Sequence, residues 1–173
     1  DGIALMWESD GGEVRSLTYS EMWRAANQLA NGLKRIGVQK GDRVGMYMPM
    51  VPEIVIALFA CFKIGAVAVP IFSGFGATAL AARLEDAKAK VLFTADGFVR
   101  RGRQGELKGR ADEAASMVSC IERVIVYKRL GIPVPWNDRK DIWWHDLMDG
   151  QTAVCETERM EAEDTALVLY SSG

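Results

Sequence analysis

The sequence has little of the chemistry that most metal centres and nucleophilic active sites use. Its 173 residues include a single histidine, His145, and only three cysteines. Cys61, Cys120 and Cys155 lie far apart, so their spacing matches neither a disulfide framework nor a zinc site. Unpaired cysteines are typical of reduced, cytosolic proteins. We therefore expect a cytoplasmic protein that holds no metal through its own side chains.

An excess of basic residues and a long apolar run are also missing. Lysine and arginine number 21 against 23 aspartates and glutamates, a net charge of -2, which disfavours a general nucleic-acid binder. The most apolar window, Val51 to Val69, is interrupted by Pro52, Glu53, Lys63 and Gly65. This pattern favours a buried helix followed by a strand over a membrane span, and no signal peptide precedes it. We expect small-molecule partners, with no nucleic acid and no membrane.

What the sequence does contain is a repeated alternation of strand and helix patterns. Thr18 and Glu21 form a capping box that opens the first helix, and Gly37 ends it. The expected elements are a β-hairpin at 3–17, helices at 18–36, 52–64, 77–89 and 111–118, and strands at 43–48, 66–71, 90–93, 123–127 and 166–170. This order predicts an α/β fold, a mostly parallel sheet with helices on both faces.

The segment from Lys90 to Arg103 carries the clearest functional signal. A short apolar strand ends in a turn at 94–97, and three arginines follow, Arg100, Arg101 and Arg103, with Gly102 between them. Ligands of open α/β sheets lie beyond the carboxyl ends of the strands, and guanidinium groups bind phosphate through two parallel hydrogen bonds. The pattern indicates an anion site. Taken alone, however, such a basic loop is more often a solvated face than a binding site.

The last third of the chain is less regular. Residues 130–141 read as a surface loop, and 143–148 as one helical turn. We interpret the segment 141–164, with eight acidic residues and one arginine, as an exposed connector. Trp143, Trp144 and His145 favour anchoring of the domain edge over catalysis, because no base partner or nucleophile is identifiable nearby. Met46, Met48 and Met50 are expected to fill the core beside a strand end.

Several motifs together resemble one family. L-T-Y-S-E-M at 17–22, G-V-Q-K-G-D-R-V at 37–44, M-P-M-V-P-E at 48–53 and A-C-F-K-I-G-A-V at 60–67 are similar to adenylate-forming enzymes. The final L-Y-S-S-G resembles the opening of their phosphate-binding signature. Within this superfamily the AMP-forming acetyl-CoA and short-chain acyl-CoA synthetases are the most similar, through G-F-G-A-T-A-L-A-A-R-L at 74–84, the arginine segment and I-W-W-H-D-L at 142–147.

The resemblance implies part of the layered N-terminal domain of a two-step ligase. A short-chain carboxylate such as acetate would attack the α-phosphate of Mg²⁺-ATP, and the thiol of coenzyme A would then displace AMP. The family's R-G-G-R motif falls on Arg100, Arg101, Gly102 and Arg103 and contacts the nucleotide of coenzyme A; Arg101 replaces a glycine, so its role stays open. The start of the ATP phosphate loop would be Ser171, Ser172 and Gly173.

The resemblance also implies how the chain is divided and how it relates to a larger enzyme. It implies an internal part of a larger enzyme, divided into a hairpin (1–17), an α/β core (18–140), an acidic connector (141–164) and a strand with the start of the phosphate loop (165–173). The rest of the polypeptide, including a mobile C-terminal domain, would supply the catalytic residues, so we expect this piece alone to be inactive. Two alternatives remain: an adenylation domain that loads a carrier protein, and a non-catalytic α/β nucleotide-binding module.

Overall fold

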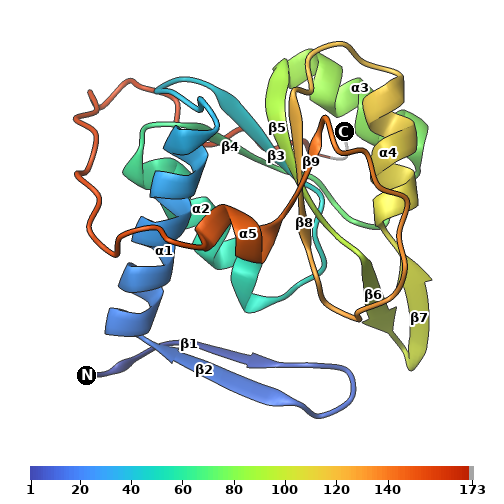
Figure 1. Cartoon of the computed structure of the whole chain (residues 1–173), viewed down its shortest axis with the longest axis horizontal. Coiled ribbons are helices and arrows are strands. Elements are labelled where there is room, and N and C mark those ends of the chain that lie inside the picture. Colours follow the sequence, from blue (N-terminus) through green and yellow to red (C-terminus); the bar gives the residue numbers. More distant parts are fainter. Residues whose placement is uncertain (172–173) are drawn as a thin grey trace.

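The computed structural model describes residues 1–171 and is built around a five-stranded parallel sheet with the strand order β4-β3-β5-β8-β9 (Figure 1). The predicted mostly parallel sheet is thus confirmed. The strands of this sheet are β3 (Arg43–Met46), β4 (Val67–Pro70), β5 (Ala89–Ala95), β8 (Arg123–Tyr127) and β9 (Asp141–Trp143). Two antiparallel hairpins stand outside it, formed by β1 (Ile3–Glu8) with β2 (Val14–Thr18) and by β6 (Gly97–Arg100) with β7 (Arg103–Glu106).

Helices cover both faces of the sheet, as the apolar strands require. One face packs against α1 (Tyr19–Arg35), α2 (Pro52–Lys63) and α5 (Trp144–Met148), and the other against α3 (Ala77–Ala87) and α4 (Lys108–Ser116). The side chains of β5 alternate between the two cores: Phe93 faces the first and Leu92 the second, and both are fully buried. No helix among residues 1–171 is long and apolar enough to cross a membrane.

The local signals for α1 and α2 have the expected structural basis. Thr18 accepts a hydrogen bond from the Glu21 N–H, and the Glu21 carboxylate accepts one from the Thr18 N–H, which completes the capping box. Pro52 occupies the first turn of α2, where its missing N–H leaves no hydrogen bond unmade. Both helix starts were therefore predicted correctly from sequence.

The order of the strands reverses direction at β3. From β3 the chain crosses to β4 on one side, then to β5 on the other, and continues outward to β8. The carboxyl ends of β3 and β5 therefore border the point where successive connections diverge. In open α/β sheets this point is where ligands bind.

The structure corrects the predicted boundaries around the arginines. The turn predicted at 94–97 is shorter, because β5 continues to Ala95 and only Asp96 separates it from β6. The arginines therefore lie on a hairpin rather than in an irregular loop. The helix predicted at 111–118 begins earlier, at Lys108, and ends at Ser116.

The strand predicted at 166–170 is reduced to a single parallel bridge between Leu167 and Ala68. Ala68 donates to the carbonyl of Ala166 and accepts from the N–H of Val168. The next donor on β4 in this direction would be Pro70, which has no N–H. The pairing consequently ends after one residue.

The segment 141–164 is more ordered than an exposed connector. Its first residues form β9 and α5, where Trp144 is buried against Phe93 with ring centroids 5.4 Å apart. This supports the anchoring role expected of the tryptophans, whereas His145 is exposed. The prediction for the methionines was wrong at Met50, which is 78% exposed; Met46 and Met48 are buried.

Candidate functional site

A groove of about 410 Å³ lies beyond the carboxyl ends of the parallel strands. Several strands of the sheet are followed by residues that line this groove: Met50 follows β3, Phe72 follows the edge strand β4, and Arg129 follows β8. The hairpin after β5 contributes Phe98 and Arg100. The groove thus occupies the position that the sheet topology favours for a ligand.

The hairpin β6–β7 places two of the predicted arginines opposite each other. Arg100 pairs with Arg103 across the strands. Directly opposed residues of an antiparallel pair lie on the same face of the ribbon with Cβ atoms about 5 Å apart, and like charges there are destabilising. Neither guanidinium has an ion-pair partner within residues 1–171. An anion between them would relieve this repulsion.

Arg101 and Gly102 form the two-residue turn of this hairpin. Both have positive φ, +52° and +69°, as the tight turns that suit twisted strands require. Glycine adopts such angles freely, whereas for arginine they are strained. Position 101 is therefore one where a glycine would be free of strain. The Arg101 N–H donates to the Asp10 carboxylate in the turn between β1 and β2, so the tips of the two hairpins meet.

The remaining predicted site residues lie elsewhere. Ser171 is exposed and is not part of the groove lining, while Ser172 and Gly173 lie outside the described residues. Tyr170, immediately before them, is fixed to α3: its hydroxyl donates to Asp86 Oδ2 at 2.7 Å. Burial, followed by the hydrogen bond to Asp86, raises the pKa of Tyr170 to about 12. The chain that leads to Ser171 is thus anchored by a neutral phenol at ordinary pH.

Asp96 organises the base of the groove. This carboxylate is fully buried and accepts hydrogen bonds from five backbone N–H groups at 2.6–3.3 Å, those of Gly97, Arg129, Leu130, Gly131 and Ile132. Asp96 therefore joins the end of β5, the start of β6 and the chain after β8 into one unit. The positions of Arg100 and Arg129 both depend on it.

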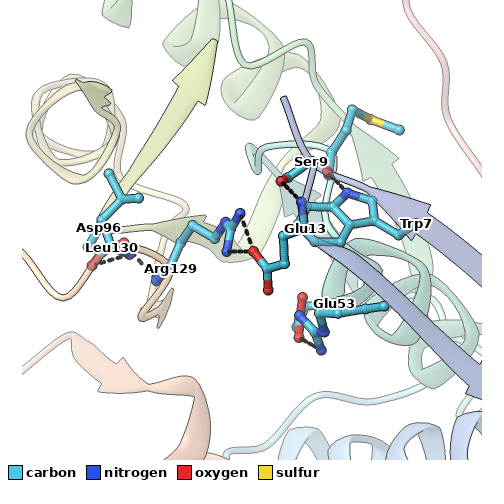
Figure 2. A network of polar contacts seen from close by, with 9 residues as sticks. Trp7, Ser9, Glu13, Glu53, Asp96, Arg129 and Leu130 are labelled. Carbon is cyan, nitrogen blue, oxygen red and sulfur yellow. Dashed lines mark hydrogen bonds and ion pairs between the residues drawn. The ribbon is translucent and has the colours of Figure 1, made fainter. Parts of the chain in front are cut away.

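A second set of contacts fixes the hairpin β1–β2 as the opposite wall. The indole N–H of Trp7 donates to the Met50 carbonyl oxygen at 2.6 Å, and the guanidinium groups of Arg15 and Arg129 lie over the Trp7 ring, 5.9 and 5.0 Å from its centroid. Figure 2 shows Trp7 beside Glu13, which the Arg129 side chain reaches from the direction of Asp96.

Below this wall lies a partly buried ion pair. Arg15 on β2 contacts Glu53 in the first turn of α2 at 2.8 Å, and the Glu53 side chain is only 8% exposed. Burial, and then the negative charge of Glu53, raises the pKa of Tyr127. The hairpin is therefore attached to α2 through a charged pair, beside a phenol that stays neutral at ordinary pH.

Of the residues that line the groove, the sequence singled out Arg100 but not Trp7, Phe72 or Arg129. Arg129 carried a usable signal, because it stands two residues after the predicted strand 123–127, at the same edge of the sheet as the other arginines. Trp7 had none, since only the folded hairpin brings it to the groove. Among residues 1–171 no cluster of three or more His, Cys, Asp or Glu side chains could hold a metal ion.

The comparisons with known proteins agree with one another. A family model described as AMP-binding enzyme matches residues 1–173. The acetyl-coenzyme A synthetase of Methanothrix thermoacetophila is 48% identical over 94% of this chain and 25% of that protein, and the one from Deinococcus radiodurans is 46% identical over 100% and 27%. The solved structure of acetoacetyl-CoA synthetase from Streptomyces lividans matches with a TM-score of 0.91 at 30% identity, covering 100% of this chain and 26% of that one. The chain spans about a quarter of the length of the curated relatives it matches.

Proposed function

Because the chain belongs to the AMP-binding enzyme family, we propose that it is part of an acid–thiol ligase that binds coenzyme A in the groove beside the hairpin β6–β7. The ligase would activate acetate or another short-chain carboxylate with Mg²⁺-ATP, releasing pyrophosphate. The coenzyme A thiol would then take the acyl group, releasing AMP. The relatives, acetyl-coenzyme A and acetoacetyl-CoA synthetases, support this reaction class.

The observation that carries the proposal is the pairing of Arg100 with Arg103 next to the groove. Two opposed cations that form no ion pair with any of residues 1–171 suit a phosphate group, which accepts hydrogen bonds from both guanidinium forks. The groove also offers the aromatic faces of Phe72 and Phe98, and nucleobases stack on such faces. The residues present therefore fit the nucleotide end of coenzyme A, whose thiol is the nucleophile of the second step.

The ATP phosphates belong to a different part of this proposal. Ser171, Ser172 and Gly173 would begin the phosphate loop, where small residues let backbone N–H groups approach phosphate oxygens closely. Tyr170 would fix the entry to this loop through its hydrogen bond to Asp86. The acid pocket, the Mg²⁺ ligands and the mobile C-terminal domain would come from other parts of the full-length polypeptide, and its cytoplasmic location also stays a prediction.

The test is the exchange of Arg100 and Arg103 for alanine in the full-length protein. Losing one charge-assisted phosphate contact costs about 1.5–3 kcal/mol, roughly tenfold or more in affinity. We expect the KM for coenzyme A to rise by at least this factor in each variant, while acid-dependent pyrophosphate exchange, which reports the first step alone, stays unchanged. The matched control is Arg139→Ala, an exposed arginine in the loop before β9.

The outcomes separate this proposal from the two other readings of the sequence. A domain that loads a carrier protein would show pyrophosphate exchange but no dependence on coenzyme A. A non-catalytic module would show neither activity. An unchanged KM for coenzyme A in both arginine variants would overturn the assignment of the hairpin.

A further inference from the structure

Arg129 is the second cation that lines the groove, and its surroundings differ from those of Arg100. It follows β8, and its side chain is 18% exposed. Its guanidinium donates two hydrogen bonds to a single oxygen of Glu13, Oε2, at 3.2 and 3.3 Å, while its plane lies over Trp7 (Figure 2). The groove thus contains an arginine already oriented by a carboxylate.

The two residues of this ion pair are restrained to different degrees by their other contacts. The backbone of Arg129 is fixed, because its N–H and those of the next three residues all donate to the buried Asp96. Glu13 lies in the turn between β1 and β2, and its side chain is 51% exposed. Its backbone N–H donates to Ser9 Oγ, but within residues 1–171 the carboxylate itself is bound by Arg129 alone. Because Glu13 is half exposed, water screens this ion pair, and the pair contributes little to the free energy of unfolding. Glu13 can therefore leave while Arg129 stays in place.

Charge explains why the carboxylate would leave. An incoming phosphate group carries more negative charge than Glu13 and offers several oxygens, so it satisfies the guanidinium fork better than a single carboxylate oxygen does. The acids that line the groove do not compete: Asp10 accepts the Arg101 N–H at the rim, and Glu8 is exposed. Arg100 and Arg129 together provide two cations along one groove.

We propose that Arg129 is a further phosphate-binding residue for coenzyme A and that Glu13 occupies its guanidinium until the nucleotide displaces it. This inference rests on the proposed function. Glu13 would compete with the ligand for the Arg129 guanidinium and keep that side chain oriented in the empty groove. The competition would favour ligands of high negative charge over weakly charged ones.

The two partners should then have opposite effects on coenzyme A binding in the full-length protein. We expect Arg129→Met to raise the KM for coenzyme A roughly tenfold, because a charge-assisted contact is lost. Glu13→Gln should lower that KM, by about two- to fivefold, because the competing ion pair is removed. In both variants the KM for coenzyme A should change more than acid-dependent pyrophosphate exchange, which reports the first step alone. The control is Arg139→Met, which removes an exposed arginine that does not line the groove and should leave the KM, kcat and the exchange unchanged.

The direction in which Glu13→Gln changes the KM for coenzyme A distinguishes a competing carboxylate from a purely structural ion pair. If the ion pair only attaches the hairpin to the sheet, both variants weaken coenzyme A binding and lower the unfolding temperature together, and that result would overturn the proposal. An unchanged KM in Arg129→Met would also overturn it. A wild-type protein without pyrophosphate exchange or thioester formation would instead refute the proposed function, so the two failures are distinguishable.

Discussion

The substitution Asp96→Asn is a direct test of how the groove is built. Asparagine keeps the shape of the side chain and one carbonyl oxygen, but it replaces the other acceptor with an NH₂ donor. Oδ1 alone serves Gly97 and Arg129, Oδ2 alone serves Gly131 and Ile132, and Leu130 donates to both oxygens. In either orientation of the amide, two backbone N–H groups therefore lose their acceptor.

The magnitude follows from burial. A buried donor left without an acceptor costs about 1–3 kcal/mol, so the two lost contacts should destabilise the fold by about 4 kcal/mol. For a domain of this size that corresponds to a decrease in Tm of roughly 8 °C or more. The same exchange at Asp138 is the control, because Asp138 is exposed and surface substitutions usually stay within about 0.5 kcal/mol.

The assay is thermal unfolding of the full-length protein combined with amide hydrogen exchange. We expect Asp96→Asn to increase exchange in the peptides that contain residues 97–106 and 129–132, while peptides from α1 and α2 remain protected. Equal Tm values for Asp96→Asn and Asp138→Asn, or unchanged exchange after β8, would refute the view that this carboxylate holds the groove together.

Two further substitutions test particular side chains. Lys108→Met should destabilise the fold by about 3–5 kcal/mol in urea unfolding, because it removes the cation that lies 2.8 Å from the buried Asp141. Adding Asp141→Asn should restore part of this stability. A double variant less stable than Lys108→Met alone would contradict the reasoning. Arg101→Gly should keep the KM for coenzyme A within about twofold of the wild-type value. The free energy of unfolding should be equal or higher by up to about 1 kcal/mol, since glycine accepts the positive φ without strain. A tenfold higher KM would show that the Arg101 side chain binds the ligand.

The sequence was most informative where local chemistry and tertiary structure agree. The capping box at Thr18, the proline that opens α2 and the apolar strands each have one stable arrangement, so their elements were predictable. The acidic segment was less predictable, because its order depends on Asn27 and Asn31, more than a hundred residues away in the sequence, which hydrogen-bond its backbone carbonyls.

The candidate site shows the same division. Arg100 and Arg103 stood out as a local cluster, and the resemblance named their ligand. Trp7 and Glu13 could not be found in this way, because the groove is assembled from segments that only the strand order brings together. The carboxylate of Asp96 was equally hidden, since nothing in the sequence distinguishes a buried acceptor of backbone N–H groups from an exposed acid in a turn.

The way the segment after α5 is attached has a consequence for how this protein can change over evolution. The side-chain amides of Asn27 and Asn31 on α1 donate hydrogen bonds to the backbone oxygens of Thr152, Ala153 and Val154. These contacts do not depend on which side chains the three residues carry. Every residue has a backbone oxygen that can accept such a hydrogen bond, so substitutions in the segment should be tolerated. An insertion or deletion, in contrast, would shift the oxygens past the two amides. Homologues should therefore vary here in composition but keep the spacing, together with the two asparagines.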